Sequence, residues 1–215
     1  MQGSQPLVMD ALRESTKELH ADTEGHQFQK DLGSGRVRQD LYVKYLGQLY
    51  LMHKHLADLL PQAAAADPRI AAVFAPYHGD LSAVVGDLGY FDASTDSVVP
   101  LTATAALLVT MDELARCSPL SLLGLLYVLE GSTNGAKFMA KTLRKGLNLP
   151  EDRGAKYFDR YGELQRERWT NFKATMNAQG FDQSEIDAIV VEAKRMFQTF
   201  FEIGCELEAL PSAVA

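Results

Sequence analysis

The sequence predicts an all-α protein, folded as a single-domain helical bundle. In several long segments apolar residues recur at intervals of three and four, which is the period of an amphipathic helix. No segment shows the sustained alternation of apolar and polar residues that marks a half-buried strand. The 215 residues, 47% hydrophobic and 23% charged, suit one globular domain that can enclose a ligand-sized pocket.

Charge and cysteine content exclude several classes of protein. The net charge of −7 argues against a general affinity for nucleic acid or for an anionic membrane. Cys117 and Cys205 are too few and too far apart for a disulfide framework, so reduced thiols are expected. The N-terminus lacks the segments of a secretory signal, and no apolar run reaches the ~18 residues that span a bilayer. A cytoplasmic protein is therefore expected.

A polar arm over residues 1–9 and a first helix over residues 11–27 are predicted, with Asp10 as the N-cap. Beside the apolar stripe of this helix runs a polar one, spaced three, four and four: Arg13, Thr16, His20 and Glu24. These side chains can face one partner. A histidine with a carboxylate one turn later suits a metal ligand that is oriented by an acceptor, but it equally suits a solvated ion pair.

The middle of the chain predicts further helices. Residues 40–60 have apolar and aromatic side chains at helical spacing, and Pro61 is expected to end that helix. Prolines and glycines divide residues 63–88 into short helices, residues 89–100 form a loop, and residues 101–116 form another helix. The remaining histidines show no chelating pattern and are interpreted as structural or surface residues: His26, His53, His55 and His78.

The next predicted helix runs from residue 119 to residue 147 and contains glycine at 131 and again at 135. Each glycine inside a helix costs roughly 1 kcal/mol relative to alanine. Because residues four apart share a helix face, these two glycines leave one patch without side chains. Either another helix packs closely there or a flat ligand approaches the backbone, and the pattern alone leaves both interpretations open.

The C-terminal third predicts two more helices. Residues 156–178 interleave aromatic residues with arginines, which in an acidic chain indicates an amphipathic helix. Ser184 is expected to open the last helix, with Asp187 at capping-box spacing. The helical domain is thus predicted over residues 10–208, followed by a tail over 209–215.

Several known chemistries lack their motifs. No glutamate is followed by histidine at the Glu-x-x-His spacing of di-iron bundles, and HExxH, CxxCH, the P-loop and GxGxxG do not occur. Zincins, covalently attached c-type haem and the common nucleotide folds are therefore excluded. A Cys–His nucleophile is not excluded by spacing, although nothing local supports it.

Three sequence blocks together resemble the haem oxygenase family in their order and separation: residues 12–20 with Glu24, residues 127–135, and residues 192–194 with Phe197. The resemblance implies a fold in which haem lies between a proximal N-terminal helix and a kinked distal helix. His20 matches the proximal iron ligand and Glu24 the acceptor that orients it. Gly131 and Gly135 match the distal glycines, whose bare backbone approaches the oxygen on the iron.

The resemblance also implies the other contacts of the ring. Arg13, where the family usually has lysine, is expected to bind a propionate, together with Tyr127 and Arg166. Apolar side chains are expected to flank the pocket or wall the ring: Phe28, Leu32, Phe197 and Phe200. Animal members carry aspartate after the first distal glycine, whereas this chain has Ser132. Proton delivery is therefore expected through ordered water, Ser132, Asn134 or backbone groups.

The implied activity is cleavage of haem, both substrate and cofactor, to biliverdin, CO and ferrous iron with O2. Because the chain has no flavin or NAD motif, electrons are expected from a separate donor such as ferredoxin or a flavoprotein reductase. The product is expected to serve a bilin-binding photoreceptor or iron acquisition. As in soluble bacterial members, no hydrophobic anchor follows Glu208.

Two other functions stay open. One is a haem-binding carrier or sensor that leaves the ring intact, which the missing aspartate makes conceivable. The other is a thiaminase-like hydrolase on a similar helical fold, with Cys117 or Cys205 as the nucleophile. The hydrolase predicts no haem binding and loses activity when its cysteine is replaced by alanine.

Overall fold

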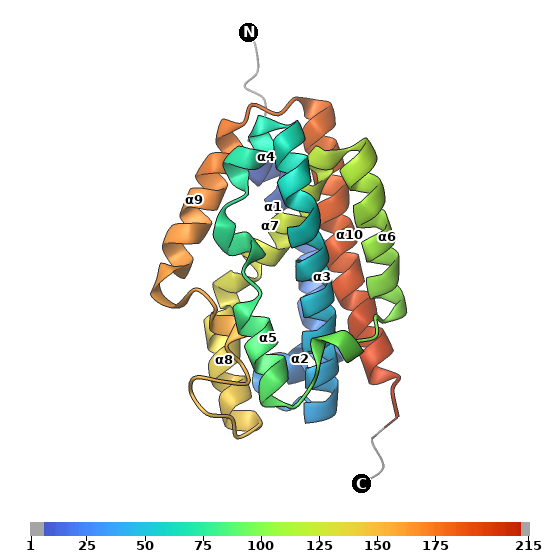
Figure 1. The fold of residues 1–215 in the computed structure, drawn as a ribbon, viewed down its shortest axis with the longest axis vertical. Helices are drawn as coiled ribbons and strands as arrows, with labels where there is room; N and C mark the ends of the chain where they lie inside the picture. The colour runs from blue at the N-terminus through green and yellow to red at the C-terminus, as the bar shows by residue number, and fades with distance from the viewer. Residues whose placement is uncertain (1–6, 212–215) are drawn as a thin grey trace.

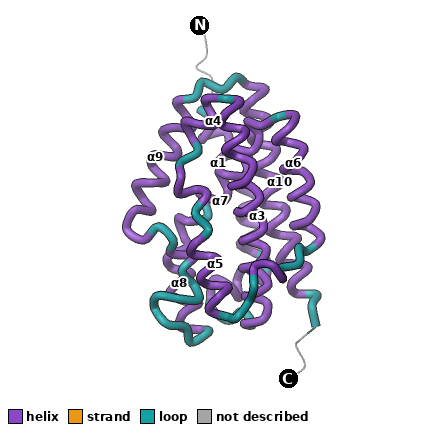
Figure 2. Tube along the Cα trace, viewed as in Figure 1, coloured by secondary structure: helices purple, strands orange, loops and turns teal. Residues whose placement is uncertain are grey.

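The structure, a computed structural model, describes residues 7–211, so most of the predicted arm (1–9) and tail (209–215) lies outside it. The described chain contains α-helices, short 3-10 turns and loops but no strand, which confirms the all-α prediction (Figure 1, Figure 2). Its α-helices are α1 (Val8–Gly25), α2 (Gln27–Ser34), α3 (Gln39–Ala66), α4 (Pro68–Val73), α5 (Ser82–Tyr90), α6 (Thr102–Cys117), α7 (Leu122–Gly131), α8 (Thr133–Gly146), α9 (Gln165–Ala178) and α10 (Gln183–Glu208).

The bundle is organised around α10, which packs along α1 and α7 and also contacts α6. Figure 1 shows α3, α10 and α6 side by side along the long axis, with α9 and α8 toward the opposite edge. One continuous apolar core joins these helices, and several of its leucines and methionines are fully buried, among them Leu12, Leu46, Met52, Leu125 and Met196. Burial of such side chains contributes roughly 1.5–3 kcal/mol each. No helix within residues 7–211 has the length and apolar character needed to cross a membrane.

The start of α1 differs from the prediction. The helix begins at Val8, two residues before the predicted N-cap Asp10, because Val8 and Met9 are buried against the core. The Met9 N–H also donates to Asn177 Oδ1 at 3.1 Å. Tertiary burial therefore outweighs the capping signal, and residues 8 and 9 do not belong to an arm.

Other boundaries were also wrong. Pro61 lies inside α3, which continues to Ala66; proline removes one backbone hydrogen bond, but Leu60 and Ala63 on either side of it stay buried. The helix predicted over residues 156–178 starts only at Gln165. Two 3-10 turns precede it, Tyr157–Asp159 (η4) and Gly162–Leu164 (η5), and the positive φ of 53° at Gly162 breaks the helical path.

The last helix is capped by Asp182 rather than by Ser184. Asp182 Oδ1 accepts the Glu185 N–H at 2.9 Å, and Glu185 Oε2 accepts the Asp182 N–H at 3.0 Å, which completes a capping box. Both Glu185 oxygens also accept hydrogen bonds from Arg69, at 2.9 and 2.8 Å. This contact with the segment after α3 holds Glu185 in the capping position, which Asp187 was predicted to occupy.

Close helix packing on a glycine occurs at Gly124, where α7 crosses α10. A Cβ on Gly124 would overlap the backbone carbonyl of Ile189. The two helices therefore approach backbone to backbone, which only glycine permits. Gly124 was not identified from the sequence, because its role depends on the partner helix.

Candidate functional site

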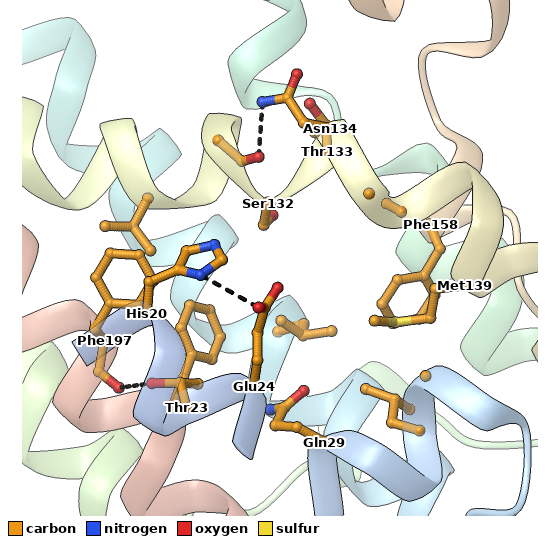
Figure 3. A pocket seen from close by; sticks show the side chains of 18 of the residues that line it. His20, Thr23, Glu24, Gln29, Ser132, Thr133, Asn134, Met139, Phe158 and Phe197 are labelled. Carbon is orange, nitrogen blue, oxygen red and sulfur yellow. Dashed lines mark hydrogen bonds and ion pairs between the residues drawn. The ribbon is translucent and has the colours of Figure 1, made fainter. Parts of the chain in front are cut away.

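A cavity of about 810 Å³ opens between α1 and the junction of α7 with α8; we call it the main cavity. Its volume lies within the usual range of small-molecule and cofactor sites, roughly 300–1,000 Å³. Side chains of α2, α3 and α10 and of the segment around η4 complete its wall. Most of the lining is apolar, and a few polar groups of α1 face the kinked α7–α8 junction (Figure 3).

His20 and Glu24 form the α1 side of the main cavity. Glu24 Oε2 lies 3.5 Å from His20 Nδ1, and the imidazole packs edge-on against Phe197 with 5.5 Å between ring centroids. Figure 3 shows both side chains pointing from α1 toward the α7–α8 junction. Because a carboxylate next to Nδ1 favours a proton there, Nε2 carries the free lone pair that a metal requires. The side chains at this spacing therefore face a cavity, as a metal ligand and its orienting acceptor would.

The opposite wall is a break in what the sequence predicted as one helix. α7 ends at Gly131 and α8 begins at Thr133. Three successive side chains each donate to the backbone carbonyl three residues earlier: Ser132 Oγ to Leu129 at 2.7 Å, Thr133 Oγ1 to Glu130 at 2.6 Å and Asn134 Nδ2 to Gly131 at 2.9 Å. Such local bonds compete with the helical ladder and often bend helices. They stabilise the kink at Ser132.

The two glycines of this wall face the cavity rather than another backbone. A Cβ on Gly135 would meet no atom within 4 Å, and a Cβ on Gly131 would lie 3.5 Å from the Trp169 ring, an ordinary contact. Both residues line the main cavity. Of the two interpretations left open by the sequence, the geometry therefore favours space for a ligand over close helix packing.

Comparison with known proteins agrees with this geometry. The family model described as Heme oxygenase matches residues 8–205. The chain belongs to the haem oxygenase family. This confirms the resemblance and identifies the protein as a haem-degrading enzyme.

Individual family members are distant in sequence but similar throughout. A heme oxygenase of Guillardia theta is 24% identical, over 92% of this chain and 84% of that protein. Heme oxygenase 1 of Homo sapiens is 24% identical, over 94% and 72%. The crystal structure of heme oxygenase-1 from Synechocystis sp. PCC6803 in complex with heme has a TM-score of 0.87 at 23% identity, covering 94% of this chain and 93% of that one.

Most residues expected from the haem oxygenase resemblance lie on the main cavity: Arg13, His20, Glu24, Leu32, Tyr127, Gly131, Ser132, Asn134, Gly135, Phe197 and Phe200. Two lie elsewhere. Phe28 belongs to the buried core, and Arg166 lines a second cavity of about 230 Å³. Burial raises the pKa of Tyr127, so its hydroxyl remains a neutral hydrogen-bond donor at neutral pH.

A buried polar cluster behind the kink was missed in the sequence. Glu130 Oε1 accepts from Arg160 Nη2 at 3.2 Å and from the Tyr161 hydroxyl at 2.7 Å. Its other oxygen lies 3.6 Å from His78 Nε2. Burial raises the pKa of Glu130, while Arg160 and the Tyr161 hydrogen bond act in the opposite direction. Residues 78, 130 and 160 are too far apart in the chain for any local pattern to have linked them.

Two histidines of this region, His53 and His78, are buried and neutral. Burial depresses the pKa of His53 well below its usual value and that of His78 to about 3. A group that titrates near pH 6.5 when unfolded and lower when folded stabilises the fold above pH 6.5 and loses this contribution as the pH falls. Each histidine is expected to remove about 1.4 kcal/mol of unfolding free energy per pH unit below 6.5.

The His78 contribution can be isolated with His78→Asn, which keeps an acceptor for the Ala75 N–H but does not titrate. Between pH 7.5 and 5.5 the wild type is expected to lose about 1.4 kcal/mol more stability than the variant, measured by urea unfolding. Burial raises the pKa values of Glu130 and Asp87, so these carboxyl groups change the unfolding free energy with pH in the opposite sense. Both proteins contain them, so their contributions cancel when the variant is compared with the wild type. Equal pH dependence of the two proteins would show that His78 is not held neutral.

Proposed function

We propose that the protein cleaves haem to biliverdin, CO and ferrous iron, with O2 and externally supplied electrons, and that haem binds in the main cavity. The observation that carries this proposal is the opposition of two walls. An imidazole with a free Nε2 lies on one side, and backbone without side chains at Gly131 and Gly135 lies on the other. Bound haem supplies both the iron that binds O2 and the ring that is opened.

The side chains of the main cavity suit this ligand. His20 Nε2 is proposed as the proximal iron ligand, and Glu24 holds the imidazole in the required tautomer and orientation. Arg13, Lys17 and Tyr127 supply donors for the carboxylates that haem carries. The aromatic rings of Phe197 and Phe200 provide an apolar wall for a flat ring. Arg166 has no such position, since it lies on the second cavity.

The distal residues are proposed to act mainly through the backbone. The Ser132 hydroxyl donates to Leu129 O, so only its oxygen lone pairs remain for water. Asn134 donates to Gly131 O and accepts from Gln165 Nε2 at 2.7 Å, which occupies both ends of its amide. These residues shape the kink, and with it the space above Gly135.

An acidic protein is proposed as the electron donor, which a ferredoxin or a flavoprotein reductase would satisfy. α8 borders the main cavity and carries four basic side chains and no acidic one, in a chain whose net charge is −7: Lys137, Lys141, Arg144 and Lys145. Lys137 is paired with Glu163 at 2.7 Å, so the proposal depends mainly on the other three. Charge complementarity of this kind steers association. The use of biliverdin by a photoreceptor or in iron acquisition stays a prediction, as does a cytoplasmic location.

Neither alternative function gains support from the geometry. Cys117 and Cys205 are exposed and do not line the main cavity; Cys205 Sγ lies 3.3 Å from His26 Nε2, but this pair is outside the cavity that His20 and Gly135 share. A haem carrier would share the binding residues but not the reaction.

The test is to bind haem, add a reductant under O2 and record the absorption spectrum. Loss of the Soret band with appearance of bilin absorption and CO supports the enzyme, whereas a persistent Soret band would leave the carrier.

A further inference from the structure

A second cavity adjoins the main cavity beside the kink. It has a volume of about 230 Å³ and lies between α8 and the turns η4 and η5. Five residues line both cavities and form a wall common to them: Thr133, Asn134, Tyr157, Phe158 and Arg160. The rest of the second cavity is mostly polar, with exposed side chains at its rim such as Glu163. Water can therefore reach the common wall from outside without passing through the main cavity.

Two polar groups of the common wall are available for proton transfer. Thr133 donates its hydroxyl hydrogen to Glu130 O, the Asn134 amide is not an acid or base at neutral pH, and Phe158 has no polar atom. Only the Tyr157 hydroxyl and the Arg160 guanidinium remain. Because a guanidinium does not release its proton in proteins, Tyr157 is the group that can pass one on.

His53 fixes the state of the Tyr157 hydroxyl. His53 Nε2 lies 2.8 Å from the Tyr157 oxygen and 3.4 Å from Arg160 Nη1. A guanidinium can only donate, so Nε2 is the acceptor and the Tyr157 O–H is donated to it. The phenol oxygen thus keeps lone pairs that can accept hydrogen bonds from water on either side of the common wall.

Glu130 and its neighbours hold Arg160 in the common wall. The guanidinium is bound to Glu130 and, at 3.3 Å, to the Leu129 carbonyl at the end of α7. His78 Nδ1 accepts the Ala75 N–H at 3.0 Å, so its proton sits on Nε2, which faces Glu130. From α9, Arg168 stacks on the rings of both Tyr77 and Tyr161 and adds a second positive charge. The ion pair with the Glu130 carboxylate holds the Arg160 guanidinium in place, whereas the like charge of Arg168 opposes it.

We propose that protons enter the distal side of the main cavity from the second cavity through the Tyr157 hydroxyl, with Arg160, Glu130 and His53 as positioning residues. The proposal rests on the proposed function, since haem cleavage consumes protons where O2 reacts. In one transfer the Tyr157 hydroxyl turns from His53 Nε2 toward water in the main cavity, and its O–H bond breaks as the proton passes to that water. A new O–H bond forms with a proton from water in the second cavity. The phenol is regenerated, and no electron moves.

The test is Tyr157→Phe, which keeps the ring and removes the hydroxyl. The first measurement is the pH midpoint of the visible spectral transition of the ferric haem complex, which reports the proton of water on the iron and needs no turnover. Loss of a hydrogen bond to distal water is expected to shift this midpoint by about 0.5–1 pH unit. The second is the rate of haem loss with reductant, expected to fall about 10- to 100-fold with an altered pH profile and solvent isotope effect.

Tyr42→Phe is the matched control. The Tyr42 hydroxyl donates to Gly154 O at 2.8 Å and so anchors the same segment, yet Tyr42 lines neither cavity. It is expected to lower stability and to leave midpoint and pH profile unchanged. Wild-type behaviour of Tyr157→Phe, or equal shifts in both variants, would overturn the proposal. If the wild type binds haem but never degrades it, the proposed function is refuted instead. The pH midpoint of the spectral transition still tests whether Tyr157 contacts water in the main cavity.

Discussion

His20→Ala is expected to abolish haem cleavage, because it removes the only imidazole that lines the main cavity. Loss of an outer partner of a metal ligand costs about 10- to 100-fold in affinity or activity, so loss of the ligand itself is expected to cost more than about 100-fold. The absorption spectrum of the ferric complex is also expected to lose the features of histidine ligation. Titration of haem into the variant and a turnover assay with reductant measure both effects.

His55→Ala serves as the control for this substitution. His55 pairs with Asp112 at 2.8 Å between α3 and α6, away from the main cavity, so its removal is expected to leave haem spectra unchanged. The haem affinity and turnover of Glu24→Gln are expected to lie between those of His20→Ala and His55→Ala. This substitution weakens the orientation of the His20 imidazole but keeps the imidazole itself. Added imidazole is expected to restore the spectrum of His20→Ala. An unchanged haem spectrum in His20→Ala without imidazole would remove His20 from the ligand role.

Gly135→Leu is expected to separate folding from haem binding. No atom lies within 4 Å of a Cβ at this position, and leucine suits a helix better than glycine by about 1 kcal/mol. The protein without haem should therefore be as stable as the wild type or more so. The added side chain occupies space in the main cavity, so haem affinity or turnover is expected to fall by at least about tenfold. A tenfold loss of affinity corresponds to about 1.4 kcal/mol.

The control is Gly86→Leu on α5, another helical glycine whose Cβ would meet no atom and which lines neither cavity. It is expected to share the gain in helix stability without any loss of haem binding. Thermal unfolding and haem titration of the two variants give the comparison. Full activity of Gly135→Leu would show that the backbone of α8 does not approach the ring.

The helices and one wall of the candidate site could be predicted from the sequence because their signals are local. Periodicity located the long helices, and the three- and four-residue spacing from Arg13 to Glu24 placed four side chains on one face of α1. Two glycines one turn apart similarly marked the distal wall. The family resemblance then connected two walls that lie more than a hundred residues apart in the chain. The haem roles of these residues stay predictions.

What the sequence by itself determined is therefore the helical bundle, the His20–Glu24 face and the bare patch at Gly131 and Gly135, since each depends on residues within one or two helical turns. Only the tertiary structure decided which glycine packs against a helix and where the buried charges lie. Gly124 needs the backbone of α10 beside it, and the pairing of Glu130 with Arg160 needs two segments brought together by the core. Such contacts depend on distance in space, which the spacing of residues along the chain does not report.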